Sequence, residues 1–330
     1  MVRSPVRYVP LLLCAIFWVR DGHGTSNRSG TFVGRPAMRE AIKMNPWAVS
    51  YEMESSDGAL SLIVASNGEC QLTRTGSFPW KGQGEDPEIG FYYYRLDQGV
   101  AESMRKMVIG LVDESPGKIE AAKPGTLFLT FGYFEEAKSP RTRSFPRNRP
   151  LPPSAERAEK SNGEIVTEML KHPVQTLKAF ASWELPEISG NQQVNVRVKL
   201  RNSGTMPIRI RNPAAAHDDR SIGLHLLIEK DVPPDELTMV DQASPTIRRN
   251  MVAQVSAPGS KEGNPPSPVV KLEPNQELVL SIGIKSNLYL GRGRYRGVVN
   301  YESMTAGIPK EEAVPGRLRI QTGTLTVKGR

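Results

Sequence analysis

The sequence predicts an α+β domain, in which an antiparallel meander carries two covering helices, followed by an all-β sandwich. Residues 46–184 combine short strand patterns and turn signals with two stretches of helical spacing. Residues 185–330 instead alternate apolar and polar side chains between turns and contain no helical stretch. At 330 residues the chain is long enough for two domains of ordinary size. We therefore expect the two regions to fold as separate domains.

Residues 1–24 have the three parts of a secretory signal peptide. A basic start is followed by the apolar stretch YVPLLLCAIFWV at 8–19 and a polar exit, and a flexible tether is predicted over 25–45. We therefore expect an extracytoplasmic protein, periplasmic or secreted. Two alternatives stay open: an uncleaved leader would tether the protein to a membrane through 8–19, and a true start at Met38 or Met44 would leave it in the cytoplasm.

The first domain begins with three strand patterns that predict a meander. A turn at 56–58 separates AVSYEME from ALSLIVAS. Asn67-Gly68 then separates ALSLIVAS from ECQLTR, and it is the strongest hairpin signal in the chain because both residues tolerate positive φ. FYYYRL and TLFLTFGYF add two further strand patterns, so we expect an antiparallel sheet.

Two stretches with apolar residues at helical spacing predict the covering helices. The first starts near Gln98, and the turn at 115–117 ends it. The second starts at Asn162 and continues to Ala181, with a kink at Pro173. Amphipathic helices of this kind usually pack on one face of an antiparallel sheet.

A basic, proline-rich loop is predicted at 139–160. Its five prolines argue against helix through most of the segment, and its arginines keep it in contact with solvent. Arg141 and Arg143 in this loop are therefore candidate contact residues for a partner.

The second domain opens with a strictly alternating segment, VNVRVKLRNSG, in which Val194, Val196, Val198 and Leu200 point inward. A Pro-, Gly- and Ser-rich loop at 256–268 interrupts the later strand patterns. Those patterns are PIRIRN, GLHLLIEK, ELTMVD, VVKLE, LVLSIGIK, GRYRGVVNYES, GRLRIQ and GTLTVK. Short strands between turns predict an antiparallel sandwich.

The run LEPNQELVLSIGI…GRGRYRGVVNYES resembles the closing strands of immunoglobulin-like domains in bacterial exported proteins. There a proline turn precedes a hydrophobic strand, and Gly-x-Tyr opens the next. VNVRVKLRNSGTMPIRI is similar to the opening strand pair of those domains. The resemblance implies an immunoglobulin-like β-sandwich and no catalytic residues. Bacterial intracellular-type proteinase inhibitors share this layout, which implies peptidase inhibition through loops such as 256–268 as one alternative. The Cys…Trp…Cys spacing of antibody domains is absent, and the first domain carries no such resemblance.

The net charge of +8 does not predict nucleic-acid binding, because the excess lies outside the predicted folded bodies. Residues 1–43 and residues 137–160 each hold seven basic and two acidic residues. A duplex-binding face needs Lys and Arg clustered on a folded surface. We therefore expect no nucleic-acid partner.

The sequence lacks the common catalytic and cofactor motifs. It contains no Gly-x-Ser-x-Gly, no His-Glu-x-x-His and no phosphate loop, and the glycines of 291–297 lead into a strand rather than a helix. The run His217-Asp218-Asp219 with His225 lacks metal-site spacing and is interpreted as a solvated turn plus a strand histidine. Cys70 is interpreted as a buried thiol. We expect no metal, no cofactor and no catalytic residue.

The remaining candidates are binding residues in strands. Arg292, Arg294 and Arg296 alternate, which predicts a basic row on one strand face that suits an acidic partner surface. In the run of three tyrosines, Tyr92 and Tyr94 share one face and form a candidate stacking platform for sugars or bases.

One loop residue joins these candidates: Trp80 lies among prolines and glycines and is the tryptophan expected to be exposed. The features together predict a non-catalytic extracytoplasmic binding protein that recognises a protein or glycan surface. The alternatives are a peptidase inhibitor and an enzyme with a dispersed site that the sequence does not reveal. Partner identity and oligomeric state stay open.

Overall fold

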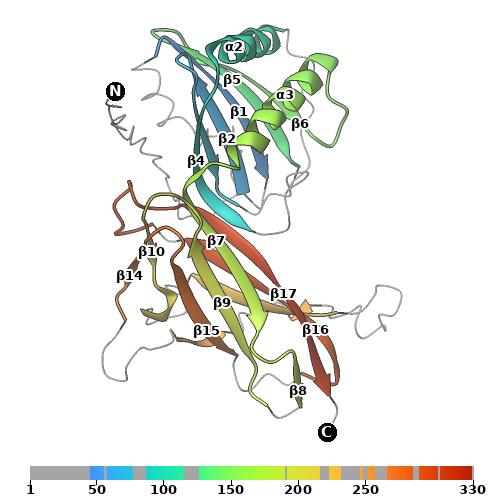
Figure 1. The fold of residues 1–330 in the computed structure, drawn as a ribbon. Coiled ribbons are helices and arrows are strands. Elements are labelled where there is room, and N and C mark those ends of the chain that lie inside the picture. Colours follow the sequence, from blue (N-terminus) through green and yellow to red (C-terminus); the bar gives the residue numbers. More distant parts are fainter. Residues whose placement is uncertain are drawn as a thin grey trace, which may run out of the picture.

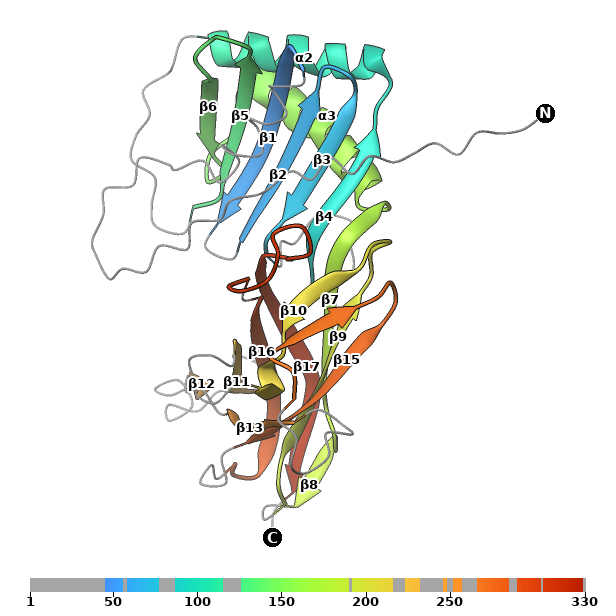
Figure 2. The same ribbon diagram turned by 90° about the vertical axis from the view of Figure 1, so that its left-hand side faces the viewer.

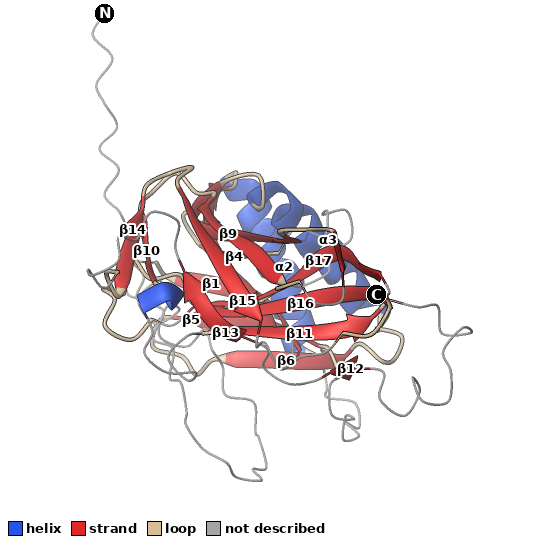
Figure 3. Ribbon diagram, turned by 90° about the horizontal axis from the view of Figure 1, so that it is seen from below, coloured by secondary structure: helices blue, strands red, loops and turns tan. Residues whose placement is uncertain are grey.

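The computed structural model describes residues 45–55, 58–76, 87–114, 126–189, 192–215, 223–231, 246–247, 252–256, 266–284, 290–303 and 305–328. Strands dominate the described residues (Figure 1, Figure 3). They form two large sheets and one small two-stranded sheet, together with two α-helices and a short 3-10 helix at Pro213–Ala215. None of the described helices is both long and apolar enough to cross a membrane.

The largest sheet has ten strands, and every neighbouring pair in it is antiparallel. Its order in space is β13 (Val252–Ser256), β15 (Glu277–Ile284), β9 (Asn195–Asn202), β7 (Pro173–Trp183), β4 (Glu88–Arg95), β3 (Glu69–Arg74), β2 (Gly58–Ala65), β1 (Trp47–Ser55), β5 (Phe128–Glu135) and β6 (Arg141–Pro146).

The second sheet has five strands and lies beside the C-terminal strands of the first (Figure 1). Its order is β12 (Thr246–Ile247), β11 (Leu224–Lys230), β16 (Gly293–Ser303), β17 (Gly316–Lys328) and β8 (Glu187–Ser189), with the β17–β8 pair parallel. A separate antiparallel pair joins β10 (Ile208–Arg211) to β14 (Val269–Leu272).

The two helices have clear local start signals. In α2 (Gln98–Asp113), the Asp97 side chain accepts a hydrogen bond from the backbone N–H of Gly99 over 2.7 Å, which satisfies a donor that the helix leaves free. In α3 (Pro153–Met169), Pro153 stands in the first turn, where a missing N–H costs nothing. Both helices pack against β1, β2 and β5 in one hydrophobic cluster.

Two hydrophobic clusters lie on opposite faces of the ten-stranded sheet. The first contains Tyr92 of β4, the two helices and the strands from β1 to β6. The second contains Ile89 of the same strand, β7, β9, β15 and the five-stranded sheet. Because side chains an odd number of positions apart in a strand point to opposite faces, β4 contributes to both clusters. The sheet therefore has the helices on one face at one end and the second sheet on the other face at the other end (Figure 2).

Trp183 joins the two layers of the second cluster. Its indole N–H donates to the backbone carbonyl of Gly323 in β17 over 2.7 Å. Its ring packs so close to Gly297 in β16 that a Cβ added there would lie 3.1 Å from the ring. A buried tryptophan satisfies its single donor in this way.

The predicted fold class, an α+β domain followed by an immunoglobulin-like sandwich, is wrong. The described chain is mostly β, and one antiparallel sheet continues from β4 through β7 into β9, across residues 184 and 185. The predicted second helix ends at Met169, and residues 173–183 form β7 instead. Leu177, Ala179 and Trp183 of β7 are buried on one face, since pairing with strands on both sides favours the two-residue period over helical spacing.

The prediction of a loop over 139–160 is also wrong. Residues 141–146 form β6, the last strand of the large sheet, and α3 begins at Pro153. Pro140 and Pro146 stand beside or at the end of an edge strand, which is where a sheet tolerates proline. The prolines therefore mark element boundaries.

Several local predictions are confirmed. A turn at Asn67 and Gly68, with Gly68 at φ +82°, joins β2 to β3. In β9, Val196, Val198 and Leu200 are buried while Arg197 and Lys199 are exposed. The first helix covers Gln98 onward as predicted.

Candidate functional site

The tyrosine platform is not formed as predicted. Tyr92 is buried in the cluster beneath the helices, and Tyr94 is half-buried, with its ring stacked on that of His172 at 5.0 Å between centroids. Tyr93 is 40% exposed on the opposite face of β4. The alternation of the three tyrosines is correct, but the accessible face is the one that carries Tyr93. Trp80 lies outside the described residues.

Arg141 and Arg143 both contact α2 of the same chain. Arg141 pairs with Asp113 and lies over the Tyr133 ring, 4.8 Å from its centroid. Arg143 donates to the backbone carbonyl of Leu111 over 2.9 Å and to Oε2 of Glu114 over 2.8 Å. A cation beside the last carbonyls of a helix stabilises its C-terminus. The two arginines therefore hold α2 on the edge strand β6.

Arg292, Arg294 and Arg296 are all exposed, which confirms the predicted alternation. Two of them share a partner, because Arg296 pairs with Oδ1 of Asp231 at 2.9 Å and Arg294 with Oδ2 at 3.5 Å. Thr324 also donates to Asp231 over 2.7 Å. This carboxylate partly neutralises the basic row.

The other residues considered in the sequence do not form a catalytic or metal-binding cluster among the described residues. His217, Asp218 and Asp219 lie outside the described residues, as do 257–265 of the predicted inhibitory loop, whereas His225 is exposed on β11. Cys70 is fully buried, and burial raises the pKa of its thiol to about 12. No cluster of metal-ligating side chains occurs among the described residues.

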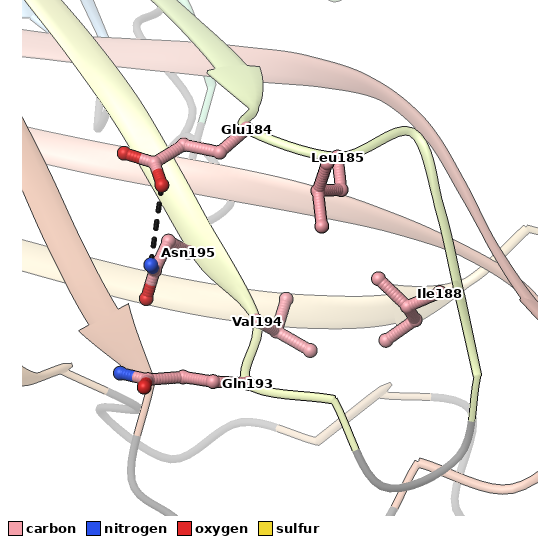
Figure 4. A pocket seen from close by; sticks show the side chains of 6 residues that line it. All are labelled: Glu184, Leu185, Ile188, Gln193, Val194 and Asn195. Carbon is pink, nitrogen blue, oxygen red and sulfur yellow. Dashed lines mark hydrogen bonds between the residues drawn. The ribbon is translucent and has the colours of Figure 1, made fainter.

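A small hollow lies between β7, β8 and the start of β9 (Figure 4). Leu185, Ile188 and Val194 line it together with Glu184, Gln193 and Asn195. The Glu184 carboxylate accepts from Asn195 over 3.1 Å and from the Ser281 hydroxyl over 2.6 Å. The hollow has a volume of about 30 Å³, which is enough for a water molecule but not for a substrate.

A polar row crosses the face of the large sheet opposite the helices, and we call it the hydroxyl row. Strand register places its members side by side: Thr73 of β3, Ser61 of β2, Glu52 of β1, Thr130 of β5 and Ser144 of β6. Ser144 is exposed and the other members are half-buried. Among the described elements, no helix or strand lies in front of β1, β2 and β3 on this face (Figure 2).

Glu52 is the only ionisable member of the hydroxyl row. The hydroxyl of Ser61 donates to its Oε1 over 3.3 Å, and no other described residue donates to this carboxylate. Burial raises the pKa of Glu52 to about 7, because the charged form loses water and gains a single hydroxyl in return; Glu54 on the same face adds to the rise. The half-buried carboxyl therefore has unused acceptor capacity among the described residues.

The flanks of the row differ in character. On one side Phe91 and Tyr93 of β4 lie on the same face as Thr73, and Tyr93 is paired in register with Gln71. On the other side the hydroxyls of Thr130 and Ser144 share a hydrogen bond of 2.8 Å. The row thus continues from an aromatic strand to hydroxyl groups at the sheet edge.

The next row along β1 contains a buried hydroxyl. Ser50 is 2% exposed, and its Oγ has no hydrogen-bond partner among the described residues. The Ser50 hydroxyl lies next to Gly132. A Cβ added at Gly132 would lie 2.5 Å from this oxygen, so only glycine leaves room for it. The Phe134 ring lies over the same glycine.

The hydroxyl row is not evident from the sequence, although half of its signal is present there. The two-residue period of AVSYEMES places Ser50, Glu52 and Glu54 on one face. The row itself, however, depends on the register of five strands, which brings together residues up to 92 positions apart in β1 and β6. No periodicity within one strand carries that information.

Comparisons with known proteins do not identify a family. No protein-family model matches the sequence, and no curated protein matches it. Among solved structures, part of the chain is similar to part of a family 123 glycoside hydrolase from Clostridium perfringens, described for glycolipid glycan hydrolysis. The match has 10% sequence identity and a TM-score of 0.17, covers 46% of this chain and spans 28% of the hydrolase chain. A TM-score this low establishes no common fold.

Proposed function

We propose that the protein is a non-catalytic binding protein that recognises a polar ligand surface through the hydroxyl row. The observation that carries this proposal is the alignment of four hydroxyl side chains and one under-solvated carboxyl across five neighbouring strands. Such a surface offers many hydrogen-bond donors and acceptors at fixed spacing. Built on a sheet, it is held in position before the ligand arrives, which lowers the entropy cost of binding.

The arrangement supports binding better than catalysis. General acid–base chemistry needs a second group positioned to act with the first, and nucleophilic chemistry needs a base beside the nucleophile. The neighbours of Glu52 in the row are hydroxyls without a histidine, and the described cysteine is buried. The side chains of the hydroxyl row can therefore hydrogen-bond to a ligand without any additional catalytic group.

A second candidate function is an enzyme that uses Glu52, and one observation favours it. A carboxyl whose pKa lies near 7 is suited to take up and release a proton at neutral pH. Turnover of any substrate that Glu52→Gln abolishes and Glu54→Gln preserves would support this candidate over the binding protein.

The binding proposal is tested by removing hydroxyls from the row and measuring capture of material from the cell envelope. The double variant Ser61→Ala/Thr130→Val should lose binding, whereas Thr326→Val should retain it. Thr326 is a half-buried strand threonine of the second sheet, so it matches the chemistry of the change. Equal binding by all three proteins would remove the row as the site.

We also propose that the protein works outside the cytoplasm. The basic start, apolar stretch and polar exit of residues 1–24 support export. Mass spectrometry of the mature amino terminus tests this: a start near Thr25 supports release, an intact Met1 supports a membrane tether, and a start at Met44 removes the argument for export.

A further inference from the structure

We propose that the ligand of the hydroxyl row is an uncharged glycan chain that lies across the strands, along the row. The inference rests on the proposed binding function and names its ligand class. Four lines of observation carry it: spacing, hydrogen-bond chemistry, charge and the distribution of exposed apolar groups.

The spacing of the row suits an extended sugar chain. Neighbouring strands lie ~4.8 Å apart, so five strands place the terminal members roughly 19 Å from each other. A pyranose unit in an extended chain advances by a length close to one strand spacing. Successive sugars can therefore meet successive side chains of Thr73, Ser61, Glu52, Thr130 and Ser144.

The hydrogen-bond chemistry of the row is that of sugar hydroxyls. A Ser or Thr hydroxyl has one donor and two acceptor positions, and so does each hydroxyl of a sugar. The Ser61 donor is used on Glu52, and one donor of the Thr130–Ser144 pair is used within the pair, so the row offers a ligand mainly acceptor positions. Glu52 receives one hydroxyl hydrogen bond, from Ser61 at 3.3 Å, among the described residues. Sugar hydroxyls would supply the donors that its carboxyl lacks, and this compensates for the desolvation that burial imposes.

Charge selects an uncharged chain over an acidic one. The ionisable side chains on this face of β1 are Glu52 and Glu54, and the row itself contains no Lys, Arg or His. Arg95 at the end of β4 is in register with Glu69, so the opposite charges of this pair beside Tyr93 compensate each other. An acidic polymer would place its carboxylates against Glu52 and Glu54, which like-charge repulsion disfavours.

The exposed apolar groups argue against a protein partner on this face. The large hydrophobic side chains that are exposed in the described chain are Tyr93, Val100, Leu185 and Met206, and they belong to separate elements. A protein interface usually has a contiguous apolar centre. One exposed aromatic beside a polar row is instead the usual composition of a sugar site, since the Tyr93 ring can stack on a pyranose while its neighbours hydrogen-bond.

Titration calorimetry with neutral oligosaccharides tests the inference. The full chain is titrated with cello-, xylo-, manno- and chito-oligosaccharides of two to six units and with oligogalacturonate as the acidic comparison. We expect one neutral series to bind, with affinity that rises with length, and at least tenfold weaker binding after Ser61→Ala, Thr130→Val or Tyr93→Ala. Thr326→Val should bind like the wild type. Thermal melting of each variant shows that it is folded.

The outcomes separate the ligand class from the binding function. Absence of binding to every neutral series, or tighter binding to oligogalacturonate, overturns the glycan assignment. Capture of a protein that depends on Ser61 and Thr130 also overturns it, while leaving the hydroxyl row as a binding site. Glycan binding that the row variants do not weaken removes the row itself, and with it the proposed function.

Discussion

Ser61 and Glu52 face each other in register across the β2–β1 pair, and the serine hydroxyl donates to the carboxylate over 3.3 Å. The carboxylate gains one donor in exchange for the water it loses on half-burial. The pairing is too weak to offset desolvation, so the protonated form of Glu52 is favoured in the fold. The stability of the fold should therefore depend on pH in a way that this carboxyl controls.

Glu52→Gln should stabilise the protein at alkaline pH. Burial raises the pKa of Glu52 from 4.5 to about 7, so the folded state binds more protons than the unfolded state between these values. Stability therefore falls as pH rises through this window and stays lower above it. Urea unfolding should show the variant more stable by on the order of 2 kcal/mol at pH 8, and by well under half of that at pH 5, where the window has only begun.

Glu54→Gln provides the control for that experiment, because Glu54 is exposed two positions further along the same face of β1. It should keep most of the pH dependence of the wild type, because burial raises the pKa of Glu52 more than the charge of Glu54 does. A Glu52→Gln protein that loses stability between pH 5 and 8 as steeply as the wild type would show that another group is responsible.

Gly90→Ala should disrupt the pairing of β4 with β7. Gly90 has φ +137°, and an added Cβ would lie 2.1 Å from the backbone oxygen of Gln175 in the neighbouring strand. Backbone strain and displacement of the strand should cost about 3 kcal/mol in the free energy of unfolding. Chemical denaturation measures the loss.

Gly110→Ala should have the opposite effect on stability from Gly90→Ala. Gly110 is exposed in α2, and no described atom beyond its own helix lies within 4 Å of an added Cβ. The change should stabilise the protein by up to about 1 kcal/mol, because alanine loses less backbone entropy in a helix. Equal effects at the two glycines would contradict the close approach of β4 to β7.

The thiol of Cys70 should be unreactive in the native protein. Its side chain is fully buried and donates to the carbonyl of Gly68 over 3.4 Å, and burial raises its pKa to about 12. Since the thiolate is the reactive form, labelling by a disulfide reagent at pH 8 should require denaturant. The experiment uses Cys14→Ser, which leaves Cys70 as the single cysteine. Labelling of the native variant within minutes would place Cys70 at an accessible surface.

Arg143→Met should loosen α2 from the sheet. The guanidinium donates to the carbonyls of Leu111 and Glu114 and to the Glu114 carboxylate, at 2.9, 3.3 and 2.8 Å, and its side chain is 16% exposed. Methionine keeps the apolar stem but leaves the last helical carbonyls without these donors. The free energy of unfolding should fall by about 2 kcal/mol.

Arg197→Met is the matched control for Arg143. Arg197 is exposed on β9, and its loss should change stability by less than about 0.5 kcal/mol. If both variants unfold at the same denaturant concentration, the contacts of Arg143 with α2 contribute nothing measurable.

Periodicity along the chain was sufficient to locate α2, the turn after β2 and the inward side chains of β9. Each of these features depends on residues that are close together in the sequence. It failed at 173–183, where Val174, Leu177 and Phe180 have helical spacing although the segment is a strand that buries Leu177, Ala179 and Trp183 on one face. It failed again at 139–160, where proline content suggested a loop although most of these prolines stand beside or at the ends of β6 and α3.

The face that is accessible, the continuity of the large sheet and the hydroxyl row depend on tertiary structure. Alternation along β4 separates Tyr92 from Tyr93, but only the packing of α2 and α3 decides which of them is buried. Burial raises the pKa of Glu52 most and Glu54 on the same strand adds to the rise, whereas the hydrogen bond from Ser61 on β2 opposes it. The physical reason is that strand register is set by contacts between distant segments, so side chains far apart in sequence become neighbours only when the sheet is assembled.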